Sequence, residues 1–468
     1  MSRPCLAVPL VCCFLAAPMA AAAPSSPLQP PPTVLTLEEA VQYALDHYPT
    51  VRAALEQIHA SAAGVDIARA AYLPRLDSLW QSNRATVNNV FGQVLPQGII
   101  PAMSGPVLPS TTGQSVWGSA TGALFSWEPF DFGLRHATIV GAQAGLTQAR
   151  ASETLTQLDV QHAVAAQFLD VVTTQRAVTA GQADLDRRNV LLKSVQTLVT
   201  NQLRPGADQS RAEAERAAAR TRLIQAEQTL TVAQTILTRV LGATTVVTIV
   251  GEPLLTRLPP GDIPPAAPTA HPFVQLRQTT VDLAHTQEDV LARTDFPRVF
   301  VQSSVFARGS GANPSGVLDG GVDGLGLDRA NWAAGVQVLF PNVFDFSTLR
   351  ARKAAAAAST RASSALYDEA LLTITSQQQT AAALLQSARA VAANTPIQLA
   401  AAQMSETQAT ARYQAGLATL IEVVEAQSLL AQADVQDQIA RVDVWRALLA
   451  AAVAHGDLTP FLSLLRQP

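Results

Sequence analysis

The chain has 468 residues, of which 48% are hydrophobic, 15% charged and 5% aromatic, and its formal net charge is −4. This slightly acidic balance excludes a nucleic-acid binder with a basic face, and the high apolar content excludes a disordered chain. The length is sufficient for two or three domains with a large core.

The N-terminus has the pattern of a secretory signal peptide, predicted over 1–22. An apolar run follows Arg3, and small residues lead to the cleavage site. All three cysteines lie in this segment, so the mature chain is expected to have no disulfide and no thiolate site. The residue before Cys12 is a valine, which does not fit a lipobox, so we expect no lipid anchor. A Pro-rich N-terminal segment over 23–35 follows.

Beyond the signal peptide the sequence repeats a set of landmarks in the same order. The paired landmarks are Pro49 and Pro272, Pro74 and Pro297, Phe130 and Phe344, Gly206 and Gly416, and Gly242 and Gly456. The members of each pair lie 210 to 223 positions apart, which predicts two tandem structural repeats.

Each repeat is expected to contain a helix, a β-hairpin and two long helices. The first repeat, 36–243, has a helix over 36–73, a hairpin over 74–129 and long helices over 131–204 and 207–241. The second repeat, 273–456, has a helix over 273–296, a hairpin over 297–341 and long helices over 344–412 and 417–455. A linker over 244–272 joins the repeats, and residues 457–468 form a C-terminal tail. No proline interrupts 131–204, which as one helix is about 110 Å long, too long for a compact domain.

The last helix carries two seams of small and apolar residues. One seam includes Val424 and Trp445, and the other includes Val423, Ala433 and Asp437. An offset of two residues is about 200° of rotation, so the seams lie on nearly opposite sides. A two-stranded coiled coil needs one seam, whereas a helix in the wall of a hollow barrel has a neighbour on each side.

The hairpin strands alternate apolar and polar residues, as Trp332, Val336, Val338 and Phe340 illustrate. Their lengths are close to the roughly 9–11 residues of a tilted transmembrane strand, although a small soluble sheet is the alternative. Four strands do not close a barrel, and open edges in lipid leave backbone groups unsatisfied. A membrane location therefore requires oligomers, either a dimer with eight strands or a trimer with twelve.

Four further motifs are LTLEEA at 35–40, YLPR at 72–75, FDFGLR at 130–135 and YQAG at 413–416. Together they resemble the TolC family of trimeric outer membrane efflux proteins. The resemblance implies a mostly α fold with a membrane part, in which three chains form a 12-stranded β-barrel continued by a 12-helix α-barrel. It also implies an outer-membrane location in a Gram-negative bacterium, with the helices in the periplasm. The family acts as the passive exit duct of a tripartite efflux system, with a periplasmic adaptor protein and an inner-membrane pump.

The resemblance places a periplasmic gate shortly after the YQAG turn, at Glu422 and Glu425. Independently, their i, i+3 spacing puts both carboxylates on one helix face. Three-fold symmetry would gather six carboxylates around the axis, and their repulsion favours protons or cations there. The alternative is a pair of ordinary solvated glutamates. Ala418 stands where the best-known member has an arginine that latches the closed gate.

The turns between the long helices resemble the ends that dock the adaptor. The corresponding residues are Arg204, Pro205 and Gly206 in the first repeat and Tyr413, Gly416 and Leu417 in the second. The alternative is that both are simple turns without a partner.

Enzymatic motifs are not evident, so we expect no enzyme and no cofactor. The seven histidines lack metal-ligand spacing, and neither a P-loop nor a G-x-S-x-G motif is present. Asp319, Asp323 and Asp328 suggest calcium ligation only faintly. Two alternative functions stay open: the exit duct of a type I protein secretion system, and a secreted trimeric coiled-coil scaffold or adhesin.

Overall fold

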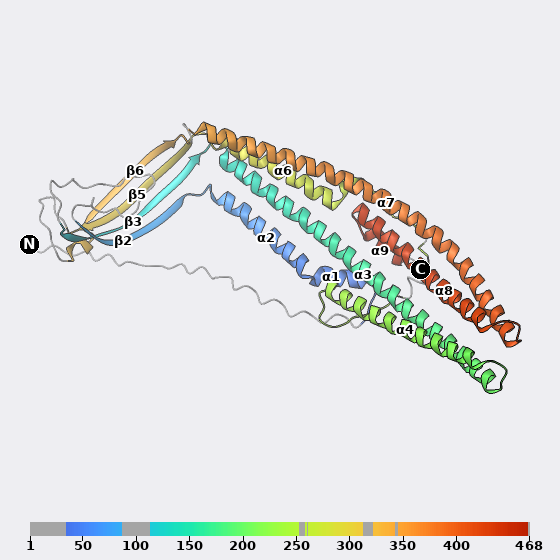
Figure 1. Ribbon diagram of the computed structural model, residues 1–468. Helices are drawn as coiled ribbons and strands as arrows, with labels where there is room; N and C mark the ends of the chain where they lie inside the picture. Colours follow the sequence, from blue (N-terminus) through green and yellow to red (C-terminus); the bar gives the residue numbers. More distant parts are fainter. Residues whose placement is uncertain are drawn as a thin grey trace, which may run out of the picture.

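The computed structural model describes residues 34–86, 113–251, 258–259, 261–311, 322–341 and 345–466. The molecule is elongated, with a sheet at one end and long helices that run from it to two turns at the other (Figure 1). The predicted signal peptide, most of the 23–35 segment, Asp319 and Phe344 lie outside the described residues. None of the described helices combines the length and apolar character needed to cross a bilayer.

The helix predicted over 36–73 is divided into α1 (Leu37–His47) and α2 (Pro49–Ala70). Pro49 has no amide hydrogen and disfavours helical backbone at Tyr48, whose φ and ψ are −69° and 127°. A capping box begins α1: the Thr36 amide donates to the Glu39 carboxylate at 2.8 Å, and the Glu39 amide donates to the Thr36 hydroxyl at 3.3 Å.

Five further helices of more than 20 residues build the body of the molecule. They are α3 (Leu134–Thr200), α4 (Gly206–Val240), α6 (Pro272–Arg293), α7 (Phe346–Gln414) and α8 (Leu420–His455). The 67 residues of α3 correspond to about 100 Å. The 69-residue helix α7 continues through Pro396, so this proline does not end it.

The four long strands form one antiparallel sheet in the order β2-β3-β5-β6. Their bounds are β2 (Arg75–Thr86), β3 (Ser115–Phe130), β5 (Arg298–Ser310) and β6 (Arg329–Leu339). Pairing of β3 with β5 joins the hairpins of the two repeats into a single sheet. In the part of the chain that the structure describes, β2 and β6 are therefore open edges.

The strand register sorts the side chains onto an apolar face and a polar face. Ala123 lies opposite Val305, and Val305 lies opposite Trp332, so these residues share the apolar face. That face also carries Leu76, Trp80, Phe125, Trp127, Val301, Val336 and Val338. The polar face carries Asp77, Gln81, Ser126, Gln302, Ser304, Asn331 and Gln337. Trp80 is 68% exposed and Trp332 78%, so the chain alone does not cover its apolar face.

The junction between sheet and helices joins two of the sequence motifs. The Asp131 carboxylate accepts hydrogen bonds from the amides of Gly133 and Arg135, which start α3, and from the Arg135 side chain at 2.9 Å. The Arg135 guanidinium lies 4.4 Å from the Tyr72 ring and donates to the Ala71 carbonyl at 3.2 Å. This buried arginine therefore fixes the end of α2 against the start of α3.

The helices stand side by side in a fixed order. Near the sheet, α2 packs on α3, α3 on α6 and α6 on α7. Farther away, α4 packs on α3, α3 on α8 and α8 on α7. The α8 seam that includes Val423, Ala433 and Asp437 is buried as far as Ala454, and Val424 and Trp445 of the other seam are also buried. The two-sided packing predicted for α8 is confirmed.

The main core lies midway along the molecule, where α1, α3, α4 and α8 meet. The predicted linker and the predicted C-terminal tail both contribute apolar side chains to this core. In the linker, β4 (Thr248–Ile249) pairs in parallel with β1 (Val34–Leu35), and η1 (Pro268–Ala270) precedes α6. In the tail, α9 (Thr459–Arg466) buries Phe461 completely, with its ring edge-on to Trp445 at 6.1 Å. Burial of these apolar side chains is what orders both segments.

Candidate functional site: the two hairpin turns

The helical hairpins α3–α4 and α7–α8 end in turns of the same construction. Each long helix ends in a left-handed residue, Gln202 with φ 59° and Gly416 with φ 79°. The next amide donates back to the helix, from Leu203 to Leu198 and from Leu417 to Arg412, both at 2.8 Å. These are Schellman motifs. The structural partner of Gly416 is therefore Gln202, not the predicted Gly206, which is the first residue of α4.

This alignment makes Arg204 the counterpart of Ala418, since both lie two residues after the left-handed position. Arg204 reaches from the first turn to the second. Its Nη2 donates to the Tyr413 carbonyl at 3.1 Å and to the Ala418 carbonyl at 3.3 Å. Its guanidinium lies 4.4 Å from the centre of the Tyr413 ring. An arginine in the first repeat thus contacts the very position where the family resemblance leads one to expect an arginine in the second.

The two hairpins also share an apolar cluster behind the turns. Tyr413, 2% exposed, packs there with residues of α3, α4 and α8, including Val195, Ala212 and Val423. Burial raises the pKa of the Tyr413 hydroxyl, the charge of Asp208 raises it further, and Arg204 opposes both effects. The hydroxyl therefore stays protonated, and the ring presents its face to Arg204 as a cation–π acceptor.

Glu422 belongs to the cap of α8. The Thr419 amide donates to its carboxylate at 3.0 Å, and the Glu422 amide donates to the Thr419 hydroxyl at 3.4 Å. These hydrogen bonds, with the charge of Arg412 at 3.8 Å, lower the pKa of Glu422 and keep it ionised. The sequence signature is Thr-x-x-Glu, the same as at Thr36 and Glu39, and it identifies this role without a structure.

Glu425 lies one turn further along α8 and is exposed. Among the described residues it has no ion pair or hydrogen bond. Of the two candidate gate carboxylates, one is therefore committed to a helix cap and the other is free.

The candidate docking residues differ in accessibility. Tyr413 is buried and Arg204 is half-buried in the contact between the turns, whereas Pro205, Gly206 and Leu417 are exposed. Leu417 is 71% exposed, and Leu203, its counterpart in the first turn, is 68% exposed. Sequence analysis missed Leu203, because its equivalence to Leu417 depends on the alignment of Gln202 with Gly416.

A buried ionic cluster joins the same helices closer to the core. Arg188 of α3, with a 1% exposed side chain, lies 3.4 Å from Asp184 and 3.5 Å from Glu215 of α4. It also donates to the Ser428 hydroxyl of α8 at 2.9 Å, and Arg222 pairs with Asp184 at 2.9 Å. The i, i+4 spacing of Asp184 and Arg188 is the only sequence signal for this cluster.

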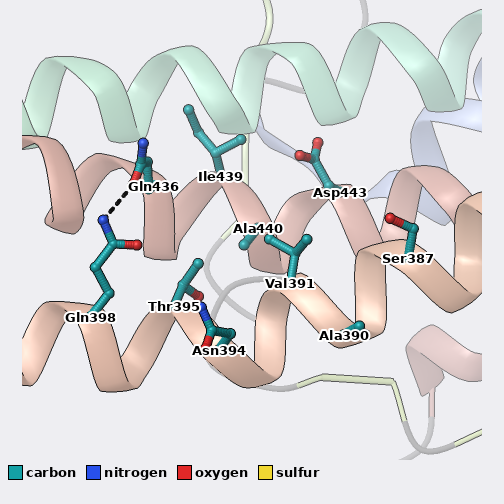
Figure 2. Close-up of a pocket in the computed structure, with 10 residues that line it drawn as sticks. All are labelled: Ser387, Ala390, Val391, Asn394, Thr395, Gln398, Gln436, Ile439, Ala440 and Asp443. Carbon is teal, nitrogen blue, oxygen red and sulfur yellow. Dashed lines mark hydrogen bonds between the residues drawn. The ribbon is translucent and has the colours of Figure 1, made fainter.

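A groove of about 580 Å³ runs between α7 and α8 (Figure 2). Gln398 and Gln436 face each other across it and are hydrogen-bonded at 3.0 Å. Its one charged lining residue, Asp443, pairs with Arg446 at 3.0 Å. The lining is thus neutral or neutralised, and it places no free acid or base beside the groove. Within the described chain, no group of three or more metal-ligating side chains is present.

Comparison with known proteins identifies the family. A family model described as "Outer membrane efflux protein" matches residues 40–243 and 271–454. The chain belongs to this family. It is a family of outer membrane channels, so the motifs that resemble TolC identify it correctly. A search of curated proteins gives no significant match.

Solved structures of outer membrane channels share the fold. VceC from Vibrio cholerae has 18% sequence identity and a TM-score of 0.70, covering 90% of this chain and 96% of that one. CusC has 14% identity and a TM-score of 0.74, covering 90% and 92%. The open state of MtrE from Neisseria gonorrhoeae has 17% identity and a TM-score of 0.72, covering 90% and 89%. The family's members are transport proteins of the outer membrane and not enzymes.

Proposed function

We propose that this chain is one subunit of a homotrimeric outer-membrane channel, the passive exit duct of a tripartite efflux system. In this assembly three four-stranded sheets close a 12-stranded β-barrel, and the helices continue it as an α-barrel through the periplasm. A periplasmic adaptor and an inner-membrane pump deliver the cargo. The observation that carries the proposal is the pair of open edges formed by the described strands and helices.

One edge consists of β2, α2 and α4, and the other consists of β6 and α7. Both retain exposed apolar side chains, such as Ile67 (74%) and Val232 (51%) on the first edge and Leu372 (73%) and Ile397 (69%) on the second. Unpaired strand edges and apolar helix sides are satisfied when identical copies join edge to edge. The first edge has β2, α2 and α4 on one side of the molecule, and the second has β6 and α7 on the other. The same rotation between neighbouring subunits can therefore bring the strand edges and the helix edges together.

The two faces of the sheet support a membrane location. An exposed apolar face with tryptophans on β2, β3 and β6 suits contact with lipid, and a polar face suits a water-filled interior. The candidate gate fits the far end of this duct. Glu422 is held ionised by its cap, and Glu425 is free on the same side of α8, so three copies bring together six carboxylates.

The exposed leucines of the two turns support adaptor docking at this end. Leu203 and Leu417 occupy equivalent positions, so each chain offers two similar apolar contacts. Photo-crosslinking groups placed at 203 and 417 in the native host are expected to capture the adaptor. The same group at Val140 of α3, which is 37% exposed near the sheet and lies on neither edge, is the control, and equal capture there contradicts docking at the turns.

A matched pair of arginine substitutions tests the membrane channel. Val336→Arg places a charge on the apolar face, at an expected cost of about 2–4 kcal/mol near the bilayer midplane, whereas Gln337→Arg places it on the polar face. We expect Gln337→Arg to yield heat-modifiable trimers in the outer membrane and Val336→Arg to reduce them strongly. Equal yields, or a wild-type protein released as a soluble monomer, would refute the proposal.

Conductance in planar bilayers tests the gate. Replacing Glu422 and Glu425 by alanine is expected to raise single-channel conductance or reduce block by cations. Glu422→Gln alone keeps an oxygen acceptor for the cap and separates the loss of charge from the loss of the cap. Unchanged conductance and cation block in both variants would remove the gate assignment.

A further inference from the structure

The charged side chains on the polar face of the sheet lie at its two ends. Near the helices are Arg75, Asp77, Glu128 and Arg298, and at the opposite end, where the strands lead into the loops, are Arg308 and Arg329. The first group is neutral within itself. Arg75 pairs with Asp77 at 2.9 Å, and Arg298 pairs with both oxygens of Glu128 at 2.6 and 2.7 Å. All excess charge on this face therefore comes from the two arginines at the loop end.

Arg308 of β5 and Arg329 of β6 lie directly opposite each other in the strand register. Side chains in such a pair have Cβ atoms about 4.5–5.5 Å apart, and like charges there are destabilising. Both residues are half-buried. No carboxylate of the described residues forms an ion pair with either guanidinium. No ion pair among the described residues therefore offsets the repulsion between them.

Two described acidic residues lie near the pair in the sequence: Asp328, which directly precedes Arg329, and Asp323 in a short helix. The short helix η2 (Asp323–Leu325) covers the apolar face, where the Ser119 hydroxyl donates to the Gly324 carbonyl at 2.8 Å. A Cβ at Gly309 would meet the Gly326 carbonyl oxygen at 1.7 Å, so glycine is required for this close approach. Neither Asp323 nor Asp328 forms an ion pair with Arg308 or Arg329 in the described structure.

The surroundings of the pair suit a bound anion. On the polar face the neighbour of Arg308 on β3 is Ala120, which is small and uncharged, and the next level holds Phe306 and Asn331. Two adjacent guanidinium groups present several N–H donors to the oxygens of a phosphate or carboxylate. An anion between them also removes their mutual repulsion.

We infer that Arg308 and Arg329 form an anion-binding site at the outer mouth of the channel, for phosphorylated or carboxylated solutes in its interior. This inference rests on the proposed function, because it takes the polar face as the channel interior. Three copies would place six guanidinium groups around the mouth, opposite in charge to the six carboxylates proposed at the periplasmic end.

The test uses tripolyphosphate as a probe on the full-length purified protein. The charge is removed by the double variant Arg308→Gln/Arg329→Gln and retained by Arg308→Lys/Arg329→Lys. Arg84→Gln is the matched control, because Arg84 lies at the same end but on the apolar face, beside Ser115 and Trp117. Binding is measured by calorimetry, and block of single channels is measured with the probe on each side of a planar bilayer.

We expect tripolyphosphate to bind the wild type and to block it from one side. In the glutamine double variant both the dissociation constant and the half-blocking concentration should rise about tenfold or more, while the lysine variant and Arg84→Gln stay within about twofold of wild type. Binding that is equal in the glutamine variant and the wild type, or a loss as large in Arg84→Gln, overturns the inference. If the inference is overturned in one of these two ways but the protein still forms conducting channels, the proposed function stands. If the wild type binds the probe at these arginines but forms no channel, the proposed function is refuted.

Discussion

The contact between Arg204 and the second hairpin turn predicts how strongly the two turns are coupled. Arg204→Ala removes two hydrogen bonds from a charged donor and a cation–π contact with Tyr413. Such hydrogen bonds contribute about 1.5–3 kcal/mol each and the cation–π contact about 0.5–2 kcal/mol. Because Arg204 is only half-buried, solvent replaces part of this, and we expect a loss of about 2–3 kcal/mol. That loss raises the population of separated turns by roughly 30- to 150-fold.

Amide hydrogen exchange measures this population. The amides of Val423 and Val424, buried behind the turn, should lose protection by the same factor in Arg204→Ala, while amides of the main core around Leu448 should not change. Arg204→Lys keeps the positive charge but loses the planar fork, so an intermediate loss is expected.

Arg211→Ala is the matched control, since Arg211 lies on the next turn of α4 and is exposed. Equal protection of the Val423 and Val424 amides in Arg204→Ala and Arg211→Ala would show that the contact of Arg204 with the second turn does not stabilise the joined turns.

Three further predictions concern the sheet, the middle of the molecule and the ionic cluster. A Cβ at Gly122 would lie 2.6 Å from the Phe306 Cβ, whereas one at Gly335 meets nothing within 4 Å, so Gly122→Ala should lower thermal stability by about 1–3 kcal/mol and Gly335→Ala should not. The buried His271 caps α6 by accepting from the Phe273 amide, and burial lowers its pKa. The unfolded chain then takes up the proton at a higher pH than the folded one, so stability should fall as the pH drops below about 6.5. The fall should be smaller in His271→Asn, which keeps a capping oxygen but does not titrate. Identical pH profiles of Tm in the wild type and this variant would contradict the prediction. Arg188→Met leaves Asp184 buried with one partner fewer and should cost about 3 kcal/mol in denaturant unfolding, unlike Arg216→Met at an exposed position of α4; an equal effect of the two would exclude the cluster as a source of stability.

Local sequence patterns were sufficient to predict those features that depend on residues close together in the sequence. Alternation along β6 gives an apolar and a polar side, two seams on α8 predict two neighbours, and the Thr-x-x-Glu spacing of Thr36 and Glu39 corresponds to a capping box. The same capping signature at Thr419 and Glu422 is equally legible, and it assigns to Glu422 a structural role that its expected place in a gate does not reveal. Each of these features involves residues within about one or two helical turns or strand repeats, so spacing alone encodes it.

Contacts between distant segments were decided only by the tertiary structure. The glycine landmarks matched Gly206 to Gly416, yet the left-handed residue that ends α3 is Gln202, because the end of the helix and not the residue type sets that position. When the turns are aligned on this residue, Arg204 is equivalent to Ala418. Its side chain contacts Tyr413, more than 200 residues away in the sequence.

The sheet and the tail follow the same principle. Pairing of β3 with β5 depends on the register across the two repeats, and the opposition of Arg308 to Arg329 depends on the register within the second hairpin; no local pattern fixes either register. The tail is ordered as a helix because Phe461 packs beside Trp445 in the main core. Spacing along the chain determined what each element is, and the burial of surfaces between distant elements determined where each one lies.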